Sequence, residues 1–330
     1  MSVFQNIKLY GTFLLLFISS ISVANTTLHK DFTGLDIPEK IFCDICSCAT
    51  SSGSTGFGTL SNANFFGVRY MYQNFESRNG IFENSPLSEE KFNTFQLWAQ
   101  ISVYKNFYVT ANLPYQDLNK TLNGVSENLS GFGDASAIGW YKHVFYKKET
   151  EETIDFSGEK TPSGHSLQFG LGVKVPTGKF EQELTDSVNP GFQVGTGSVD
   201  GIFSLGHNYA GDKLGVNTLL SYYAKGENKN EYQFGDQFSY SSRVFTVMST
   251  QTINFMPFVG VSGDVYSEIK QYGETIANSN GNIVNGSLGL EVVYKKFIFG
   301  SNYTLPVYQD LFGGNVNSKQ RVSVYFNIAI

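Results

Sequence analysis

The chain of 330 residues carries few charges, since Asp, Glu, Lys and Arg together make up only 16% of it. A soluble protein usually has about 25% charged residues. The formal net charge is −6, and no cluster of Lys and Arg stands out, which argues against a nucleic-acid partner. No repeat of about 20–50 residues is visible either, which argues against a propeller or a solenoid.

Long hydrophobic runs are also scarce. One apolar stretch of roughly 15 residues follows Lys8, whereas about 20 are needed to span a membrane. Ser22 and Ala24 stand at positions −3 and −1 of a cleavage point before Asn25, so we expect a cleavable signal peptide over residues 1–24. A membrane-anchor helix is the alternative. The mean hydropathy of −0.16 argues against a bundle of membrane helices.

Aromatic residues and glycines are plentiful instead, at 15% and 34 residues. Beyond residue 62 the sequence alternates with a period of two, most clearly over residues 167–175. Successive side chains of a strand point to opposite faces, so Leu167, Phe169 and Leu171 share an apolar face, and Gln168 and Lys174 share the other. This pattern is typical of a membrane barrel with lipid outside and a polar lumen.

The same alternation predicts about twelve strands. They are expected near residues 64–75, 95–104, 107–113, 134–146, 167–175, 198–209, 213–224, 240–252, 255–267, 288–293, 297–307 and 321–330. The segment 140–146 is ambiguous, because Lys142 falls on the same face as Trp140 and Val144.

The connections between these strands alternate in length. Tight turns are expected at 105–106, 210–213, 253–254 and 295–296. Long polar connections are expected at 77–92, 117–132, 180–197, 226–239, 269–284 and 308–319. Outer-membrane barrels have short periplasmic turns and longer outer loops, so both chain ends are expected in the periplasm. The stretch 147–164 breaks the rule, either as a true inner loop or because the strand count is wrong by two.

These observations predict an all-β protein, a transmembrane antiparallel β-barrel of about 12 strands over residues 62–330. A periplasmic segment with all the cysteines, residues 25–61, precedes the barrel. Its expected partners are outer-membrane lipid, the barrel assembly machinery of a Gram-negative cell and a small-molecule solute. A soluble β-sandwich or β-helix is the alternative, although a sandwich usually carries more charge. Only closure into a barrel pairs all the backbone of strands in lipid.

Several short motifs resemble a known family. Residues 175–180 read V-P-T-G-K-F, and residues 189–198 read N-P-G-F-Q-V-G-T-G-S. Related motifs are L-P-Y at 113–115, G-F-G-D at 131–134 and L-P-V-Y-Q-D-L at 305–311. Together they resemble the outer-membrane barrels known as transporters of the phenol meta-cleavage pathway, distant kin of fatty-acid transport barrels. The resemblance covers roughly residues 56–330 and implies a barrel with an uptake or efflux role, without implying phenol.

The C-terminus departs from the usual pattern. Many outer-membrane barrels end in an aromatic residue that the assembly machinery reads, whereas this chain ends in Ile330. Phe326 falls on the same predicted face, so the last strand is still amphipathic. The departure puts the efficiency of assembly by that route in doubt.

Cys43, Cys46 and Cys48 are the only cysteines and form a C-x-x-C-x-C motif. Two of them can form a disulfide in the periplasm, leaving the third thiol unpaired. Alternatively, the three thiolates can bind one soft metal ion such as Cu(I) or Zn(II), with His29 or Asp44 as a further ligand. Lipid attachment is disfavoured because no apolar run directly precedes Cys43. Residues 25–61 are expected either to plug the lumen or to hang free.

Charged residues on the predicted polar face are the candidate functional residues. The lumen candidates are Arg69, Lys174, Asp264, Glu291 and Arg321. They either select solutes or form a salt-bridged network that fills a narrow barrel. Residues 176–198 are expected to gate the outer mouth or simply to form turns, in which Pro and Gly set the geometry.

We expect no catalytic activity and no cofactor beyond the metal considered above. No G-x-S-x-G motif appears, and His143, His165 and His207 fall near predicted inner strand ends rather than at the outer rim. The sequence therefore favours an outer-membrane transporter or channel for small solutes, with apolar and aromatic ones among the candidates. The alternative is a structural or surface-binding barrel with a filled lumen.

Overall fold

The computed structural model describes residues 64–78, 85–145, 152–154, 160–162, 164–184, 187–211, 214–250 and 252–330. The predicted signal peptide and the three cysteines lie outside these residues. No helix among the described residues is long and apolar enough to cross a membrane.

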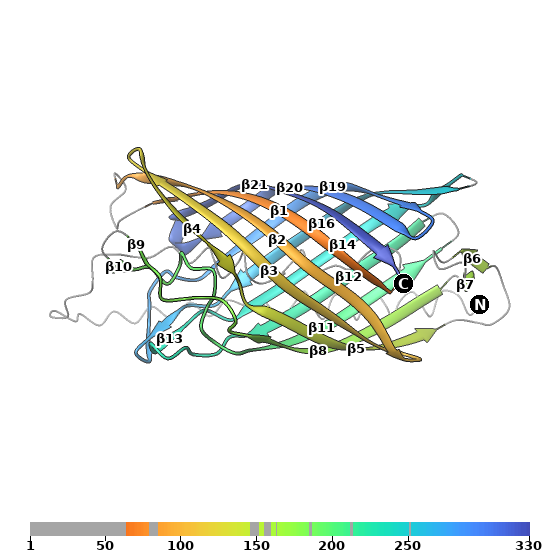
Figure 1. Ribbon diagram of the computed structural model, residues 1–330, viewed down its shortest axis with the longest axis horizontal. Helices are drawn as coiled ribbons and strands as arrows, with labels where there is room; N and C mark the ends of the chain where they lie inside the picture. Colours follow the sequence, from red (N-terminus) through yellow and green to blue (C-terminus); the bar gives the residue numbers. More distant parts are fainter. Residues whose placement is uncertain are drawn as a thin grey trace, which may run out of the picture. The chain divides into compact units, whose positions relative to one another are not determined.

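Twelve antiparallel strands form a closed barrel, as the sequence predicted (Figure 1). They are β1 (Phe65–Arg78), β2 (Leu87–Tyr104), β3 (Phe107–Leu122), β5 (Ala135–Phe145), β8 (Gly164–Val175), β11 (Asp200–Ala210), β12 (Leu214–Ala224), β14 (Gln237–Thr246), β16 (Ile253–Tyr266), β19 (Gly281–Tyr294), β20 (Phe297–Leu311) and β21 (Val316–Ala329). Each strand pairs with its neighbour along the chain, and the pairing of β1 with β21 closes the barrel.

Short elements occupy the connections. They are β4 (Val125–Phe132), β6 (Glu152–Ile154), β7 (Lys160–Pro162), β9 (Glu183–Leu184), β10 (Ser187–Val188), β13 (Tyr232–Gln233), β15 (Met248–Ser249), β17 (Lys270–Gln271), β18 (Glu274–Thr275) and the 3-10 turn η2 (Phe312–Gly314).

The barrel has two distinct ends. The terminal end is where β1 begins and β21 finishes, and there Ile330 N donates to Asn64 O over 3.0 Å. The tight turns between β2 and β3 and between β19 and β20 lie at this end, and the connections 176–199, 225–236 and 267–280 lie at the opposite, loop end. β5 ends and β8 begins at the terminal end, so the connection between them joins that end, and the alternative of a strand count wrong by two is not needed there.

Three predicted long loops are wrong in detail. The strands around 77–92, 117–132 and 308–319 continue as hairpins, so that only residues 79–86, 123–124 and 312–315 separate them. These extensions carry polar residues on both faces, because neither face of a strand needs to be apolar beyond the lipid layer. The alternation of apolar and polar residues that predicts a strand is therefore weaker there. The turn expected at 253–254 lies earlier, where the N–H of Thr250 donates to Ile253 O over 2.8 Å.

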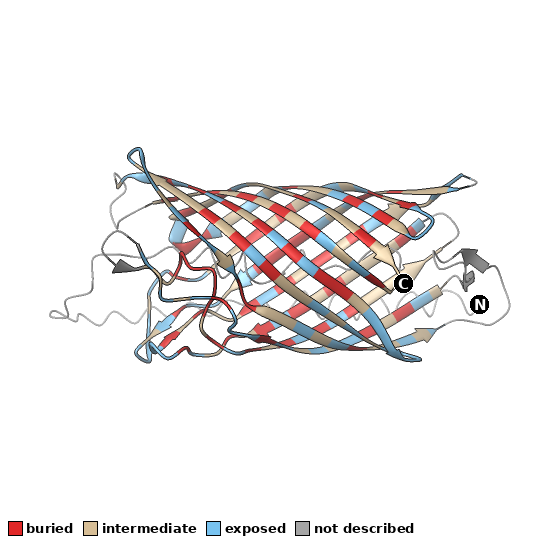
Figure 2. Ribbon diagram, in the orientation of Figure 1, coloured by how far each residue is buried: buried red, intermediate tan, exposed pale blue. Residues whose placement is uncertain are grey.

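The two faces of the wall differ as the alternation predicted. Figure 2 shows buried and exposed residues alternating along the strands. Exposed apolar side chains cover the outer face, among them Val68, Leu97, Phe169, Leu171, Phe203, Val259, Leu288 and Phe299. Buried polar side chains dominate the inner face, among them Gln96, Gln116, Ser204, Ser221, Ser239, Ser241, Asn285 and Asn327. The ambiguous segment resolves in the same way, because Trp140 is buried on the inner face.

Glycines on the inner face make room for aromatic rings from the next strand. A side chain at Gly300 would overlap the Tyr325 ring, and one at Gly289 would overlap the Phe258 ring. Gly215 has the same relation to Phe245, and Gly170 to Trp140. The rings therefore lie flat against the wall of the barrel. Aromatic side chains that pointed toward the barrel axis would fill part of the lumen instead.

Candidate functional site

An apolar cluster gathers at the loop end of the barrel. Its buried members, here called the loop-end cluster, are Phe75, Phe92, Leu118, Leu129, Phe192, Val194, Tyr232, Phe234, Ile269, Ile283, Leu311, Phe312 and Val316. Some belong to the extended strands β1 to β4 and β19 to β21, Phe312 belongs to η2, and the others belong to the three long connections. The connections therefore fold inward onto the opposite wall and cover the lumen at this end, where Figure 2 shows buried stretches within them.

A buried network of ion pairs fixes the longest of these connections. Lys174 Nζ lies 3.2 Å from Asp134 Oδ2 and 2.8 Å from Asp200 Oδ2, and Lys225 Nζ lies 3.6 Å from the same Asp200 oxygen. Lys174 also donates to the Thr196 hydroxyl, which itself donates to Asp134. We call this group the Lys174 network. Its buried charges are matched, as burial requires.

The Lys174 network holds both ends of the connection 176–199. Asp134 accepts the backbone N–H of Gly178 over 3.0 Å and that of Thr196 over 2.9 Å. A Cβ atom on Gly195 would stand 2.5 Å from the carbonyl carbon of Gly178, so only glycine allows this approach. The glycines of the P-T-G and G-T-G-S stretches are thus required for packing, in line with the prediction that Pro and Gly set the turns here.

A second, exposed link joins this connection to the next one. Glu181 binds Lys229 through a contact of 2.6 Å and accepts the Asn230 amide over 2.9 Å. The hydrogen bonds from Lys229 and Asn230 lower the pKa of the Glu181 carboxyl below its ordinary value. Because both charged side chains are largely in solvent, the link contributes little to stability.

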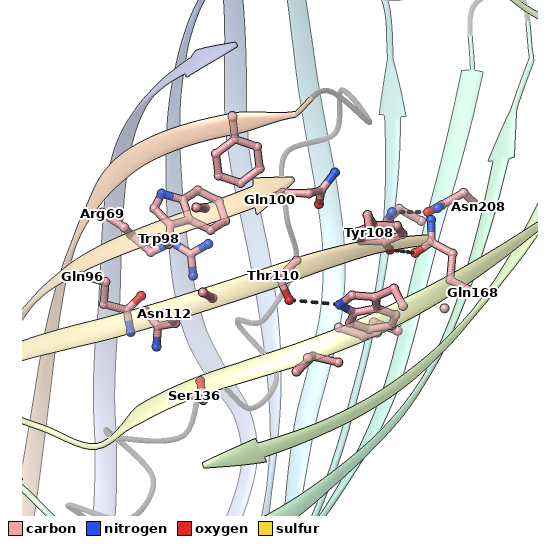
Figure 3. A pocket seen from close by; sticks show the side chains of 18 of the residues that line it. Arg69, Gln96, Trp98, Gln100, Tyr108, Thr110, Asn112, Ser136, Gln168 and Asn208 are labelled. Atoms are coloured by element: carbon pink, nitrogen blue, oxygen red, sulfur yellow. Dashed lines mark hydrogen bonds between the residues drawn. The ribbon is translucent and has the colours of Figure 1, made fainter. Parts of the chain in front are cut away.

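The lumen contains a chamber of about 100 Å³ in its terminal half (Figure 3). Its polar lining comes from Arg69, Gln96, Gln100, Thr110, Asn112, Ser136, Gln168, Asn208, Asn217 and Thr218. Its apolar lining comes from Phe65, Trp98, Tyr108, Ile138, Trp140 and Leu219, with Ala99, Ala111 and Gly206. Amide groups and aromatic faces on one small cavity are typical of a site for a small molecule.

Aromatic contacts hold the walls of the chamber in place. Tyr108 and Trp140 stack with ring centroids 5.8 Å apart, and Trp140 Nε1 donates to Thr110 Oγ1 over 3.0 Å. On the other side the Arg69 guanidinium lies 3.8 Å from the centre of the Trp98 ring. Such a cation–π contact fixes the guanidinium at the chamber wall.

The five predicted lumen residues all lie on the inner face, in separate groups. Arg69 lies on Trp98, whose ring is 5.7 Å from Tyr325, and Tyr325 donates to Glu291. Lys174 belongs to the network at the loop end. Asp264 accepts from Ser239 over 2.6 Å and from Gln237 over 3.0 Å. Arg321 Nε and Nη2 each lie 2.8 Å from the amide oxygen of Gln73 when that amide faces them.

Sequence reasoning missed the residues that give these groups their geometry. Asp134 and Asp200 were not singled out, although Asp134 directly precedes β5 and Asp200 is the first residue of β11, each after a glycine-containing stretch. Gln96, Trp98 and Asn112 were on predicted strands, but only the register, with Arg69 opposite Gln96 and Trp98 opposite Asn112, brings them together. The signal available in the sequence was the concentration of bulky polar residues on one face.

The three described histidines lie at the terminal end, as predicted. His165 Nδ1 is 3.0 Å from His207 Nε2, and His143 lies against Phe145 with ring centroids 4.6 Å apart. A pair of imidazoles does not supply the base and carboxylate that activate a nucleophile. Within the described part of the chain, no group of three or more His, Cys, Asp or Glu side chains is placed to hold a metal ion.

A shallow apolar hollow of about 660 Å³ lies on the outer face of the wall. Its lining includes Val68, Tyr70, Phe95, Leu97, Leu113, Tyr115, Phe132, Phe299, Val324 and Phe326. Its position on β1 to β4, β20 and β21 makes it part of the apolar outer surface rather than of the lumen.

No protein-family model and no curated protein matches the sequence. Among solved structures, an outer-membrane channel from Pseudomonas putida F1 is similar, with a TM-score of 0.58 over 83% of this chain and 98% of that chain at 10% identity. The β domain of the Bordetella autotransporter BrkA has a TM-score of 0.46 over 82% of this chain and 100% of its own at 9% identity. The translocator domain of NalP from Neisseria meningitidis reaches 0.42 over 86% and 93% at 10% identity. The first likeness is one of fold, and the chain has the architecture of a 12-stranded outer-membrane β-barrel.

Proposed function

We propose that this chain is an outer-membrane channel that passes small polar solutes through a lumen whose outer mouth is closed by folded loops. One observation carries the proposal, namely a closed barrel that is apolar outside and polar inside and contains a chamber. The fold that it shares with the Pseudomonas putida channel supports the same conclusion. Pairing of all strands removes the exposed edges that lipid does not tolerate.

In this proposal the terminal end faces the periplasm and the loop end faces the outside. The signal peptide 1–24 directs export, the barrel assembly machinery inserts the barrel, and residues 25–61 stay in the periplasm. The thiols of Cys43, Cys46 and Cys48 form a disulfide or bind a soft metal there. The short connections at the terminal end support this orientation, because periplasmic turns are the short ones in such barrels.

The membrane location predicts the cost of charges on the outer face. Leu171 is 65% exposed in the middle of β8, and we expect Leu171→Arg to lower the free energy of unfolding from vesicles by about 2–4 kcal/mol. Leu87 is 55% exposed at the loop end of β2, where Leu87→Arg is expected to cost about 1 kcal/mol or less. Urea titration of both variants in vesicles measures the difference. Equal costs at the two depths would contradict the membrane location.

Osmotic swelling of vesicles tests passage directly. The mature chain refolded into vesicles is expected to admit a small neutral sugar slowly, and a variant with the connection 176–199 released, Lys174→Met, is expected to admit it faster. A matching variant that lacks residues 25–61 shows whether this segment plugs the lumen, since its removal then also speeds entry.

A structural or surface-binding barrel is the second candidate function. The loop-end cluster favours it, because buried apolar side chains cover the lumen there. If neither the mature chain nor the Lys174→Met variant admitted solute, the barrel would be assigned this role and the channel proposal would be rejected.

A further inference from the structure

The described lining of the chamber carries one positive charge. Among the described residues that line it, Arg69 is the only charged one. This contrasts with the whole chain, whose formal charge is −6. A buried guanidinium in a small cavity favours an anion, since the low dielectric there strengthens its field. The Arg69 guanidinium therefore disfavours a cation beside it in the chamber.

The chamber also contains polar atoms without a hydrogen-bond partner among the described residues. They are the Gln96 Nε2 donor and both the Nδ2 donor and the Oδ1 acceptor of Asn112. Gln96 is only 2% exposed. Leaving a buried polar group without a hydrogen bond is unfavourable, so each of these atoms requires a ligand or water.

These atoms belong to one constellation. Gln96 lies opposite Arg69 across β1 and β2, and Asn112 lies opposite Trp98 across β2 and β3. Figure 3 shows Gln96 and Asn112 side by side below Arg69 and Trp98. Two amide donors and a guanidinium match the oxygens of a carboxylate, whereas the Asn112 Oδ1 acceptor requires a donor such as a hydroxyl.

We propose that the chamber is a binding site for a small hydroxycarboxylate. The carboxylate binds Arg69 with the amides of Gln96 and Asn112, the hydroxyl donates to Asn112 Oδ1, and the carbon body lies against the rings of Trp98 and Phe65. The volume of about 100 Å³ restricts the ligand to a few heavy atoms. This inference deepens the proposed function, on which it rests, by naming the solute class that the lumen holds on its way through.

The two tryptophans of the chain provide the measurement. Trp98 and Trp140 are the only ones, and both line the chamber, so the intrinsic tryptophan fluorescence of the folded chain in detergent reports on this cavity alone. Titration with lactate is expected to change the emission along a saturable curve. Propionate lacks the hydroxyl and lactamide lacks the charge, and each is expected to bind about tenfold more weakly or worse, because a buried group is left unpaired.

Three variants make the assignment specific. Arg69→Gln and Asn112→Leu are each expected to weaken lactate binding about tenfold or more. Arg321→Gln removes a different cation from the inner face, one that faces Gln73 rather than the chamber, and is expected to change the affinity by less than about twofold, since Arg321 is not among the residues that line the chamber. All three are compared only after their circular dichroism matches that of the folded barrel.

The inference is overturned if lactate gives no saturable change, if lactamide binds as well as lactate, or if Arg321→Gln weakens binding as much as Arg69→Gln. Binding in detergent does not depend on transport. Swelling without lactate binding would therefore reject the site and leave the channel standing, and lactate binding without swelling would reject the channel and leave the site.

Discussion

Replacing Lys174 by methionine is expected to lower the free energy of unfolding from vesicles by about 3–5 kcal/mol, the usual cost of removing one partner of a buried ion pair. Lys174 lies between the carboxylates of Asp134 and Asp200, and all three side chains are almost fully buried. Without the ammonium, two carboxylates remain close together with Lys225 as their remaining cation. Urea titration of the variant in vesicles measures the loss.

Lys319→Met is the matched control for this substitution. Lys319 Nζ lies 2.7 Å from Glu76 Oε2, a shorter distance than either ion pair of Lys174, but both side chains are substantially exposed. Exposed pairs contribute about 1 kcal/mol or less, so this variant should unfold nearly as the parent does. If the two variants lost the same stability, burial of the Lys174 network would not be what fixes the connection 176–199.

Phe192→Ala is expected to have the second large effect. The Phe192 side chain comes from the connection 176–199, is 1% exposed and contacts Phe92 with ring centroids 6.0 Å apart. Truncating a buried phenylalanine lowers the free energy of unfolding by about 3–5 kcal/mol. Here the lost packing destabilises the position in which the connection closes the lumen. We therefore expect a higher single-channel conductance in planar bilayers together with a lower stability.

Phe132→Ala provides the comparison at the same end of the barrel. Phe132 is 57% exposed on the outer face of β4, so its truncation should change neither conductance nor stability by more than a small amount. An unchanged conductance in Phe192→Ala would mean that the loop-end cluster does not control the opening.

The alternation of the strands was sufficient to predict most of the barrel. Residues 167–175 have one apolar and one polar face because the lipid side of the wall must be apolar and the lumen side need not be. The hairpin extension of β3 was missed, since Asp117, Asn119 and Lys120 show no apolar face where none is required. Local periodicity thus predicts a strand only as far as the two sides of the wall differ.

The candidate site was less accessible to prediction. Alternation alone predicts that Arg69 and Lys174 lie on the inner face of the barrel. The side chains that surround them, however, come from residues far apart in the chain. Asp134 and Thr196 are 62 residues apart, and Trp98 meets Tyr325 through the closure of the barrel. The inward fold of Phe192 and Val194 was likewise out of reach, because an apolar residue in a polar loop does not reveal which wall it packs against.

The Asp134 carboxylate accepts two backbone hydrogen bonds from the connection 176–199. One comes from the N–H of Gly178 near its start and the other from the N–H of Thr196 near its end. A segment tied at both ends to a single point cannot peel away residue by residue. The connection either keeps both hydrogen bonds or loses both and moves as a rigid unit, because a packed element occupies discrete positions and does not deform continuously. Current through a single molecule would then jump between two levels and dwell at each, instead of drifting through intermediate values.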